Sequence, residues 1–363
     1  MSRFCSPSIK NVTPYTPGEQ IDDLHLIKLN TNENPFSPSP LVLDALKDEM
    51  TNGSLHLYPD PESQALKKCI ADYYEIVPEQ VFLGNGSDEV LAHTFLSFFK
   101  QNSPLLFPDI TYSFYTSYCS LYGIDYKKVP LQNYKINIGD YKQTNGGIIF
   151  PNPNAPTGSI LTVSEIEKLL SINTESIFVV DEAYVDFGGE SSVRLIDKYP
   201  NLLVIQTLSK SRSLAGMRVG FAMGNSKLIN TLNSVKNSFN SYPIDRLSSV
   251  AAIAAFQDKD YFNENRQLII NNREWLKKSL LELNFEVLPS EANFLFVSHP
   301  KFNNGLQLTM KLREKNILVR HFNAFPIERF LRISIGTQQQ CTYLVESLKE
   351  IMFYRHKNPA IAE

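Results

Sequence analysis

Short apolar runs alternate with longer segments of helical periodicity through the middle of the chain. The apolar runs lie at 81–83, 105–107, 148–150, 177–180, 202–205 and 219–222. Strands that are apolar on both faces are typical of a sheet that is buried on both sides, and helices between them favour parallel pairing. We therefore predict an α/β fold in which a mostly parallel central sheet is flanked by helices.

The pattern changes after about residue 245. An Ala-rich helix is expected at 250–256 and a long polar helix at 263–283, followed by strands at 294–297, 317–320 and 331–335. Leu344, Leu348 and Ile351 then fall on one face of a last helix. This layout is typical of a smaller α+β domain.

The first 36 residues are rich in Pro, Thr and Asn, and we predict that they form an irregular arm. A helix is expected to start at Ser39, with Pro40 at its first position and with Leu43, Leu46 and Met50 on one face. We predict three segments: 1–50, the arm and first helix, which belong to the small domain; 51–245, the large domain; and 246–363, the rest of the small domain.

Composition and charge exclude several classes of protein. The chain has 363 residues and a formal net charge of −3, without the basic excess expected of a nucleic-acid binder. No apolar run is long enough to span a bilayer, and the first ten residues do not have the pattern of a secretory signal. The four cysteines are widely scattered, which favours a reducing cytoplasm and gives no metal-ligand spacing.

The segment 207–220 carries the most informative chemistry. Lys210 is flanked by two serines, and Arg218 follows eight positions later. An amine can capture a carbonyl carbon, and hydroxyl groups with an arginine suit a phosphate. Taken alone, the segment could equally be a solvated loop.

Three other segments follow predicted strands. Asp181 ends one strand, with Tyr184 three residues later, and a carboxylate at that edge of a parallel sheet is well placed to meet a ligand. The turn at 84–89 is rich in glycine and leads into a helix, where backbone N–H groups can bind a phosphate. The turn at 151–158 is made rigid by three prolines. Each of these segments alone could be an ordinary connection.

Together these four segments, in this order, resemble the fold-type I pyridoxal 5'-phosphate (PLP) aminotransferases. More narrowly, the chain is similar to the histidinol-phosphate aminotransferase family. The further segments that carry this resemblance are 29–35 (LNTNENP), 57–60 (LYPD), 111–115 (TYSFY), 290–294 (SEANF), 317–320 (ILVR) and 331–337 (LRISIGT).

The resemblance implies roles for residues around the cofactor. Lys210 would hold PLP covalently and move a proton, Asp181 would pair with the ring nitrogen, and Tyr184 would bond the ring oxygen. Tyr112 would stack on the ring, and Tyr58 would reach the phosphate from the other subunit of a homodimer. The remaining cofactor-binding residues would be Gly86, Ser87, Asp88, Asn154, Ser209 and Arg218.

On the substrate side, the resemblance implies that Arg320 and Arg332 meet the phosphate or carboxylate, with Tyr15 and Asn34 also binding substrate. One position departs from the family. The family commonly has Asn before Pro-Thr-Gly, where it bonds the ring oxygen, and this chain has Ala155. Either Asn154 takes over that contact or Tyr184 makes it alone.

The implied activity is a ping-pong transamination through pyridoxamine phosphate, between L-histidinol phosphate with its keto partner and glutamate with 2-oxoglutarate. The resemblance leaves open a threonine-phosphate decarboxylase and a broad aromatic aminotransferase of the same fold. A PLP-binding regulator without turnover is a further alternative, but the 36-residue arm is too short to supply a DNA-binding module. We expect no metal and no membrane partner.

Overall fold

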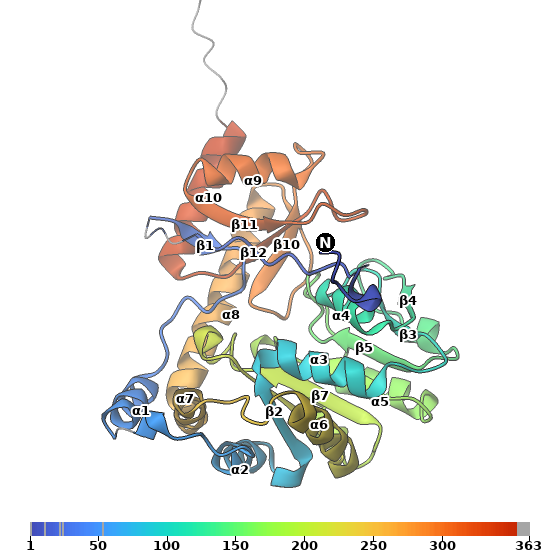
Figure 1. The fold of residues 1–363 in the computed structure, drawn as a ribbon. Helices are drawn as coiled ribbons and strands as arrows, with labels where there is room; N and C mark the ends of the chain where they lie inside the picture. Colours follow the sequence, from blue (N-terminus) through green and yellow to red (C-terminus); the bar gives the residue numbers. More distant parts are fainter. Residues whose placement is uncertain (1, 11, 22, 24, 53, 354–363) are drawn as a thin grey trace, which may run out of the picture.

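The computed structural model describes residues 2–10, 12–21, 23, 25–52 and 54–353. Its helices and strands form two β-sheets, each covered by helices (Figure 1). In the described part of the chain, no helix is both long enough and apolar enough to cross a membrane.

The larger sheet has seven strands in the order β2-β8-β7-β6-β5-β3-β4. Their bounds are β2 Val81–Asn85, β3 Leu105–Pro108, β4 Tyr126–Val129, β5 Gly147–Pro151, β6 Phe178–Asp181, β7 Leu202–Thr207 and β8 Val219–Gly224. β8 is antiparallel to both of its neighbours, and the other neighbouring strands pair in parallel. The predicted, mostly parallel sheet is therefore confirmed.

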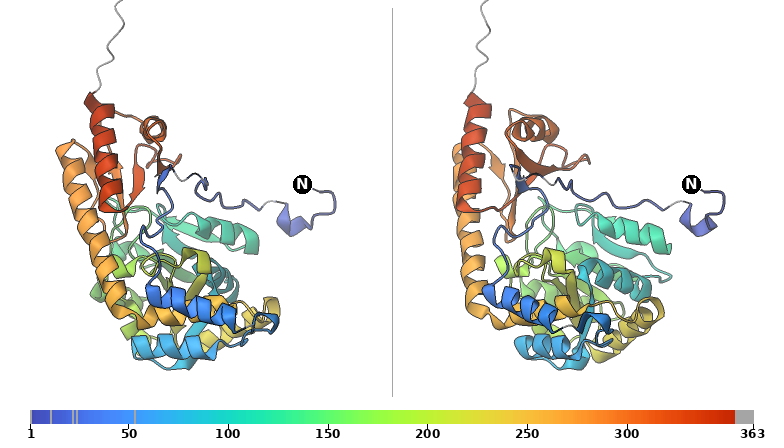
Figure 2. Two further views of the ribbon diagram at one scale, coloured as in Figure 1. Left: turned by 90° about the vertical axis from the view of Figure 1, so that its left-hand side faces the viewer. Right: turned by 60° about the vertical axis from the view of Figure 1, so that its left-hand side comes forward.

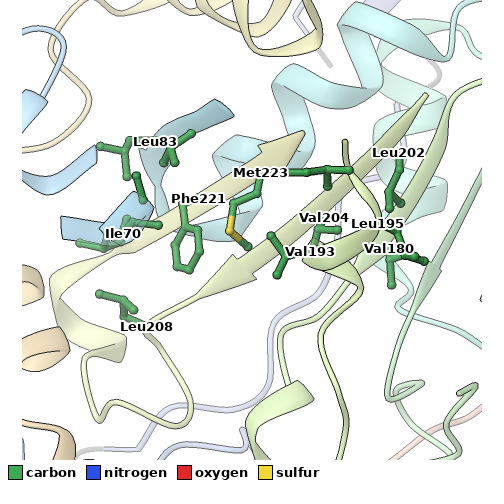
Figure 3. Packing of buried hydrophobic residues seen from close by; sticks show 14 of the residues in the cluster. Ile70, Leu83, Val180, Val193, Leu195, Leu202, Val204, Leu208, Phe221 and Met223 are labelled. Atoms are coloured by element: carbon green, nitrogen blue, oxygen red, sulfur yellow. The ribbon is translucent and has the colours of Figure 1, made fainter. Parts of the chain in front are cut away.

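Helices cover both faces of the larger sheet. On one face α2 (Gln64–Tyr74), α5 (Val163–Ile172) and α7 (Arg246–Gln257) share a core with the strands. This core includes Ile70, Val204 and Phe221, which Figure 3 shows from close by. The other face is covered by α3 (Gly86–Phe98), α4 (Phe114–Tyr122) and α6 (Ser226–Phe239). Two covered faces explain why most of these strands have no exposed residue.

The smaller sheet has five strands in the order β1-β11-β12-β10-β9. Their bounds are β1 Ile27–Leu29, β9 Glu286–Val287, β10 Phe294–Ser298, β11 Ile317–His321 and β12 Leu331–Ser334. The helices α8 (Lys259–Glu282), α9 (Gly305–Arg313) and α10 (Gln338–Phe353) share its core. The long helix α8 runs beside both parts of the molecule (Figure 2).

The N-terminal arm is not irregular throughout, and the prediction was wrong for residues 27–29. These residues form β1, which pairs in parallel with β11, Leu29 lying opposite Val319. A three-residue strand leaves too short a pattern for periodicity to detect, and its partner lies almost 300 residues further along the chain. Residues 2–10 extend away from the body of the molecule (Figure 2).

The helix α1 (Pro40–Thr51) begins as predicted, because Ser39 accepts a hydrogen bond from the Val42 N–H. The predicted apolar face is only partly buried, with Leu46 packed against the core of the larger sheet. Val42 is the fully buried residue, whereas Leu43 and Met50 are 52% and 61% exposed. α1 packs against α7, and both contribute to the core of the larger sheet. The limits at 50/51 and 245/246 stay a prediction, and this packing favours counting α1 and α7 with the large domain.

Candidate active site

The residues predicted to carry chemistry meet at one edge of the larger sheet. This edge is formed by the carboxyl ends of β2, β3, β5, β6 and β7, where open α/β sheets bind ligands. The smaller sheet and part of the N-terminal arm close a cavity of about 410 Å³ over it, and the arm contributes Tyr15, Gly18, Gln20, Asn30, Thr31 and Glu33. Predicted site residues that line this cavity are Tyr15, Ser87, Asp88, Tyr112, Asp181, Tyr184, Ser209, Lys210, Arg218, Arg320 and Arg332.

Lys210 follows the end of β7 and extends its amine into the cavity. The Nζ atom donates a hydrogen bond of 3.1 Å to the Thr31 carbonyl. Burial, together with the nearby positive charge of Arg332, lowers the pKa of this amine to about 8. The amine is therefore much closer to its neutral, nucleophilic form at physiological pH than an exposed lysine would be.

Asp181 is the last residue of β6, the strand beside β7. It is 4% exposed and accepts hydrogen bonds from Tyr115 Oη at 2.9 Å and from the Ala183 N–H at 3.3 Å. Burial raises the pKa of its carboxyl to about 6, although the Tyr115 hydrogen bond acts in the opposite direction. A buried carboxylate with only neutral donors around it is ready to pair with a cationic ligand group.

An anion cradle lies where β2 enters α3. Gly86 has a φ of +77°, and a Cβ there would come within 2.3 Å of Arg218 Nη2. Arg218 is itself left-handed, with a φ of 52°, and its Nη2 lies 3.1 Å from Asp88 Oδ2. The N-terminus of α3 points at the same place, and helix N-termini favour anions.

Hydroxyl groups complete the cradle on the side of β7. Thr207 Oγ1 donates to Ser209 Oγ at 2.9 Å and accepts from the Ser209 N–H at 3.2 Å. Ser87 lines the cavity from the first turn of α3. The cradle thus offers backbone N–H groups, hydroxyls and one guanidinium, which is a donor set that suits a phosphate.

Aromatic side chains form one wall of the cavity. Tyr112 donates from Oη to Asp88 Oδ1 at 3.0 Å, and burial beside Asp88 raises the pKa of its phenol well above the ordinary value. Tyr15 stacks on Phe114 with ring centroids 4.6 Å apart, and its edge meets Tyr112. This wall can accept a flat ring.

Arg320 and Arg332 lie directly opposite each other in the β11–β12 pair. Both line the cavity. Arg332 Nη2 donates to the Asn30 carbonyl at 3.0 Å, whereas its Nε is buried without a partner among the described residues. Like charges opposite each other in a sheet are unfavourable. Two adjacent guanidinium groups at a cavity therefore indicate a second anion-binding position.

Four predicted residues are absent from the lining of this cavity: Gly86, which lies beside Arg218, and Asn154, Asn34 and Tyr58. Asn154 donates to the Ile110 carbonyl and to Thr157 Oγ1, at 3.0 and 2.9 Å. Asn34 donates to the carbonyls of Lys210 and Ser211, so it fixes the backbone of the loop that carries the lysine. Tyr58 is 78% exposed and stacks on Tyr242. Their predicted contacts with cofactor or substrate stay predictions.

Sequence reasoning missed several residues of the site. Asn32 donates to Tyr184 Oη at 3.0 Å, Tyr115 holds Asp181, and Glu33 lines the cavity beside its ion pair with Lys28. Asn32 and Glu33 lie within the segment 29–35 that carried the family resemblance, which is the signal that pointed to them. Tyr115 likewise lies within the segment 111–115 that carried the resemblance, although its partner Asp181 is 66 residues away.

The residues present fit the cofactor that the resemblance implies. A buried amine, a buried carboxylate without a cationic partner and an anion cradle share one cavity, as an aldehyde, a pyridine nitrogen and a phosphate require. Ala155 also lines the cavity and offers only a methyl group. Among the described residues, no group of three or more His, Cys, Asp or Glu is placed to hold a metal ion.

Comparison with known proteins indicates the same family as the resemblance of the sequence motifs. Residues 25–348 match the family model described as aminotransferase class I and II. The histidinol-phosphate aminotransferase 1 of Pseudomonas fluorescens strain Pf-5 is 56% identical over 97% of this chain and 100% of its own length. That of Methylococcus capsulatus is 54% identical over 97% of this chain and 98% of its own.

Solved structures share the fold. The histidinol-phosphate aminotransferase of Sinorhizobium meliloti, solved with pyridoxal-5'-phosphate, superposes with a TM-score of 0.87 at 22% identity, covering 97% of this chain and 98% of its own. The Clostridium acetobutylicum enzyme gives a TM-score of 0.83 at 24% identity, covering 90% of this chain and 99% of its own. At these identities the likeness establishes the fold.

Proposed function

The chain belongs to the aminotransferase class I and II family, and we propose that it is a PLP-dependent histidinol-phosphate aminotransferase. It would interconvert L-histidinol phosphate and 2-oxoglutarate with imidazole-acetol phosphate and L-glutamate, a step of histidine biosynthesis. Near-full-length relatives of that name at 54–56% identity support this substrate. The observation that carries the proposal is a single cavity with a buried lysine between two separate anion-binding positions.

PLP, when bound, supplies an electron sink that makes a proton at the substrate Cα acidic. Lys210 would hold the cofactor covalently and then, once released, carry that proton as a general base. Its lowered pKa suits this role, because a base must be largely neutral at the working pH. Its position at the end of β7 fixes the amine over the cavity.

Asp181 would pair with the protonated ring nitrogen and keep it protonated. Its carboxylate is held by Tyr115 and the Ala183 N–H, so it cannot turn away from the cavity without losing both hydrogen bonds. Gly86, Ser87, Ser209 and Arg218 would hold the cofactor phosphate. Asp88 fixes the guanidinium of Arg218 and the phenol of Tyr112 at the same time.

Arg320 and Arg332 would bind the acidic groups of the two substrates in turn. Histidinol phosphate offers a phosphate, and glutamate offers its distal carboxylate at a comparable distance from the amine. A planar guanidinium binds either anion through two hydrogen bonds. The opposed pair of arginines gains most from an anion, because the anion relieves their mutual repulsion.

The main alternative within the same fold is a threonine-phosphate decarboxylase, which would use the same cradle and arginines. The relatives at more than 50% identity are named as aminotransferases, which supports transamination. A broad aromatic aminotransferase is less well supported, since the substrate end of the cavity presents two arginines instead of an apolar pocket.

A homodimer with shared active sites is part of the proposal. Six large apolar side chains between residues 41 and 58 are exposed: Leu41, Leu43, Met50, Leu55, Leu57 and Tyr58. Several exposed apolar side chains on one surface are typical of a subunit interface. Tyr58 lies on this surface and is absent from its own cavity, which supports its predicted role in the cavity of the partner subunit.

All four cysteines are free thiols, which fits the predicted cytoplasmic location.

The activity is tested by incubating the purified protein with PLP, histidinol phosphate and 2-oxoglutarate and measuring glutamate. We expect glutamate formation that is lost in Lys210→Ala. Borohydride reduction followed by peptide mapping should place the pyridoxyl group on Lys210. Carbon dioxide release from threonine phosphate without glutamate formation would contradict the proposal, and a label at another residue would reject the role of Lys210.

A further inference from the structure

Asn32 joins the smaller sheet to Tyr184 in the active site. Its Nδ2 lies 3.0 Å from Tyr184 Oη. Its other polar groups are all held from the smaller sheet: the N–H and Oδ1 by Ser334 at 2.9 and 2.8 Å, and the carbonyl by Asn293 at 3.0 Å. Asn32, Asn293 and Ser334 are at most 2% exposed, so water cannot replace these contacts.

These contacts fix the direction of every hydrogen bond in the group. The Asn32 N–H can only donate, so Ser334 Oγ accepts from it and directs its own proton to Asn32 Oδ1. The amide orientation follows, since Oδ1 is the acceptor for Ser334 and Nδ2 must face Tyr184. An NH₂ group can only donate. Tyr184 Oη is therefore the acceptor in this contact and keeps its own proton.

Among the described residues, the Tyr184 hydroxyl has no acceptor, so it can donate only toward the cavity that Tyr184 lines. A ligand oxygen in the cavity would supply that acceptor. The two neighbouring positions that could offer another donor do not: Ala155 has no polar side chain, and the amide of Asn154 is bonded to Ile110 and Thr157.

We propose that Asn32 is a positioning residue that makes Tyr184 a hydrogen-bond donor toward the ring oxygen of the cofactor. This inference rests on the proposed function. In this chain Asn32 would do, through Tyr184, the work of the amide that Ala155 cannot provide. A donor stabilises an ionised ring oxygen, so it lowers the pKa of the Lys210–cofactor linkage and tightens cofactor binding.

The local backbone explains why an asparagine stands here. Asn32 has a φ of 56°, in the left-handed region that asparagine, aspartate and glycine tolerate best. Arg332, Asp181 and Asp88 act electrostatically on the Tyr184 phenol, and Lys210 Nζ lies 5.9 Å from the centre of its ring, but none of the four is hydrogen-bonded to the hydroxyl. The hydrogen bond from Asn32 is thus the single direct contact that sets its polarity in the described chain.

Two substitutions at Asn32 distinguish a change in the hydrogen bond to Tyr184 from a loss of side-chain packing. Asn32→Asp keeps the shape and the backbone angle but offers an acceptor, which draws the Tyr184 proton away from the cavity. Asn32→Gly removes the side chain without backbone strain. Asn284→Gly is the matched control, because Asn284 also has a positive φ (63°) and is exposed and distant from the cavity.

The readouts are the pKa of the cofactor linkage, from the pH dependence of absorbance, and the dissociation constant for PLP. For Asn32→Gly we expect the linkage pKa to rise by about 0.5–1 unit and PLP to bind about 3–10-fold more weakly. Asn32→Asp should shift both further in the same direction. Asn284→Gly should leave both unchanged.

The outcomes separate the two proposals. A wild-type protein that forms no cofactor linkage would overturn the proposed function together with this inference. A wild-type protein with a normal linkage, and Asn32→Asp with an unchanged linkage pKa, would overturn this inference alone. A loss of thermal stability in Asn32→Gly with no change in either readout would reduce Asn32 to a structural residue and would also overturn it.

Discussion

At the scale of single residues, burial gives Lys210 and Asp181 their chemistry. Both sit at strand ends that the smaller sheet covers, and the pKa of each moves toward its neutral form, to about 8 for the amine and about 6 for the carboxyl. Asp181 has no cationic partner, and the negative charges of Glu33 and Asp88 offset the burial of the Lys210 amine only in part. A ligand that offers an aldehyde to the Lys210 amine and a cationic nitrogen to the Asp181 carboxylate would therefore satisfy both groups.

The pH dependence of cofactor capture follows from Lys210. Only the neutral amine attacks an aldehyde, and its folded pKa of about 8 lies below the ordinary 10.5. The rate of PLP capture by the apoprotein should rise about tenfold per pH unit up to about pH 8 and then level off. Stopped-flow absorbance measures this rate. A midpoint near 10.5 would show that the amine is not buried as described.

The same shift affects stability. The unfolded chain keeps a proton on Lys210 up to about 10.5, and the folded apoprotein releases it at about 8. Between these values the unfolded state binds more protons, so this residue makes folding more favourable as pH rises through that range. Below pH 8 the buried charge costs stability.

Ala155 offers a direct gain-of-contact test. Ala155→Asn places an amide donor in the cavity wall beside Tyr184. A second donor to the ring oxygen should lower the pKa of the Lys210–cofactor linkage by about 0.5–1 unit. The spectrophotometric titration measures this pKa, with Ala155→Ser as a smaller polar control. An unchanged titration would show that position 155 has no contact with that oxygen.

Contiguous motifs made some site residues predictable and left others out. Lys210, Ser209 and Arg218 fall within one short segment, whose residue types suggested a lysine beside an anion site and whose roles came from the family resemblance. Asn32 is a site residue because of Tyr184, 152 positions away, and no local pattern encodes that pair. Asn34 and Asn154 show the opposite case, since their amides are used by the nearby backbone instead of the cavity.

At the scale of elements, the junction of β2, α3 and β8 builds the anion cradle. Gly220 of β8 lies so close to α3 that a Cβ there would come within 2.3 Å of the Ser87 nitrogen. The antiparallel β8 thereby brings Arg218, just before it, to the first turn of α3. Close backbone packing, and not side-chain length, positions the guanidinium.

Alanine variants of two glycines distinguish an effect on the anion cradle from an effect of backbone strain. Gly86 is the first residue of α3, and Gly123 directly follows α4. Gly86 and Gly123 both have positive φ, +77° and +63°, but a Cβ meets Arg218 at Gly86 and nothing within 4 Å at Gly123. Both alanine variants should lose about 1 kcal/mol of stability from the backbone. Only Gly86→Ala should also weaken PLP binding, by about tenfold or more.

Denaturation midpoints and PLP titrations measure the two effects. Equal PLP affinity in both variants would show that the cradle lies elsewhere.

Most elements of the large sheet were predictable because their strands are short, fully apolar and separated by helices. The pattern Thr162-x-x-Glu165 is typical of a capping box, and both of its hydrogen bonds are present at the start of α5. β4 was missed, since it is an edge strand with three exposed residues. For α1 the periodicity located an apolar stripe, but it could not tell whether that stripe faces the core of this chain or another surface.

At the scale of the whole molecule, the site lies between two sheets and is closed by the N-terminal segment. Residues 31–34 contact the Lys210 loop and the smaller sheet at once, through Thr31, Asn32 and Asn34. Loss of the arm should therefore affect the site as well as the small domain. A large central sheet and a smaller group of strands were predictable from the pattern of apolar runs, but the packing of α1 against α7 was not.

The shared-site dimer gives a prediction at this scale. Gel filtration should give an apparent mass of about twice the 41.3 kDa of the chain. Tyr58→Phe should weaken PLP binding, although Tyr58 does not line its own cavity, and the exposed Tyr126→Phe should not. An apparent mass near 41 kDa at full activity would contradict the shared site.

The central claim is that one cavity accepts histidinol phosphate and 2-oxoglutarate in turn and passes an amino group between them. The most direct test is a pair of half-reactions followed by absorbance on the PLP-loaded protein, without the second substrate present. The account predicts that histidinol phosphate alone bleaches the band of the Lys210–cofactor linkage and that 2-oxoglutarate then restores it. A band that histidinol phosphate leaves unchanged, or that 2-oxoglutarate fails to restore, would contradict it.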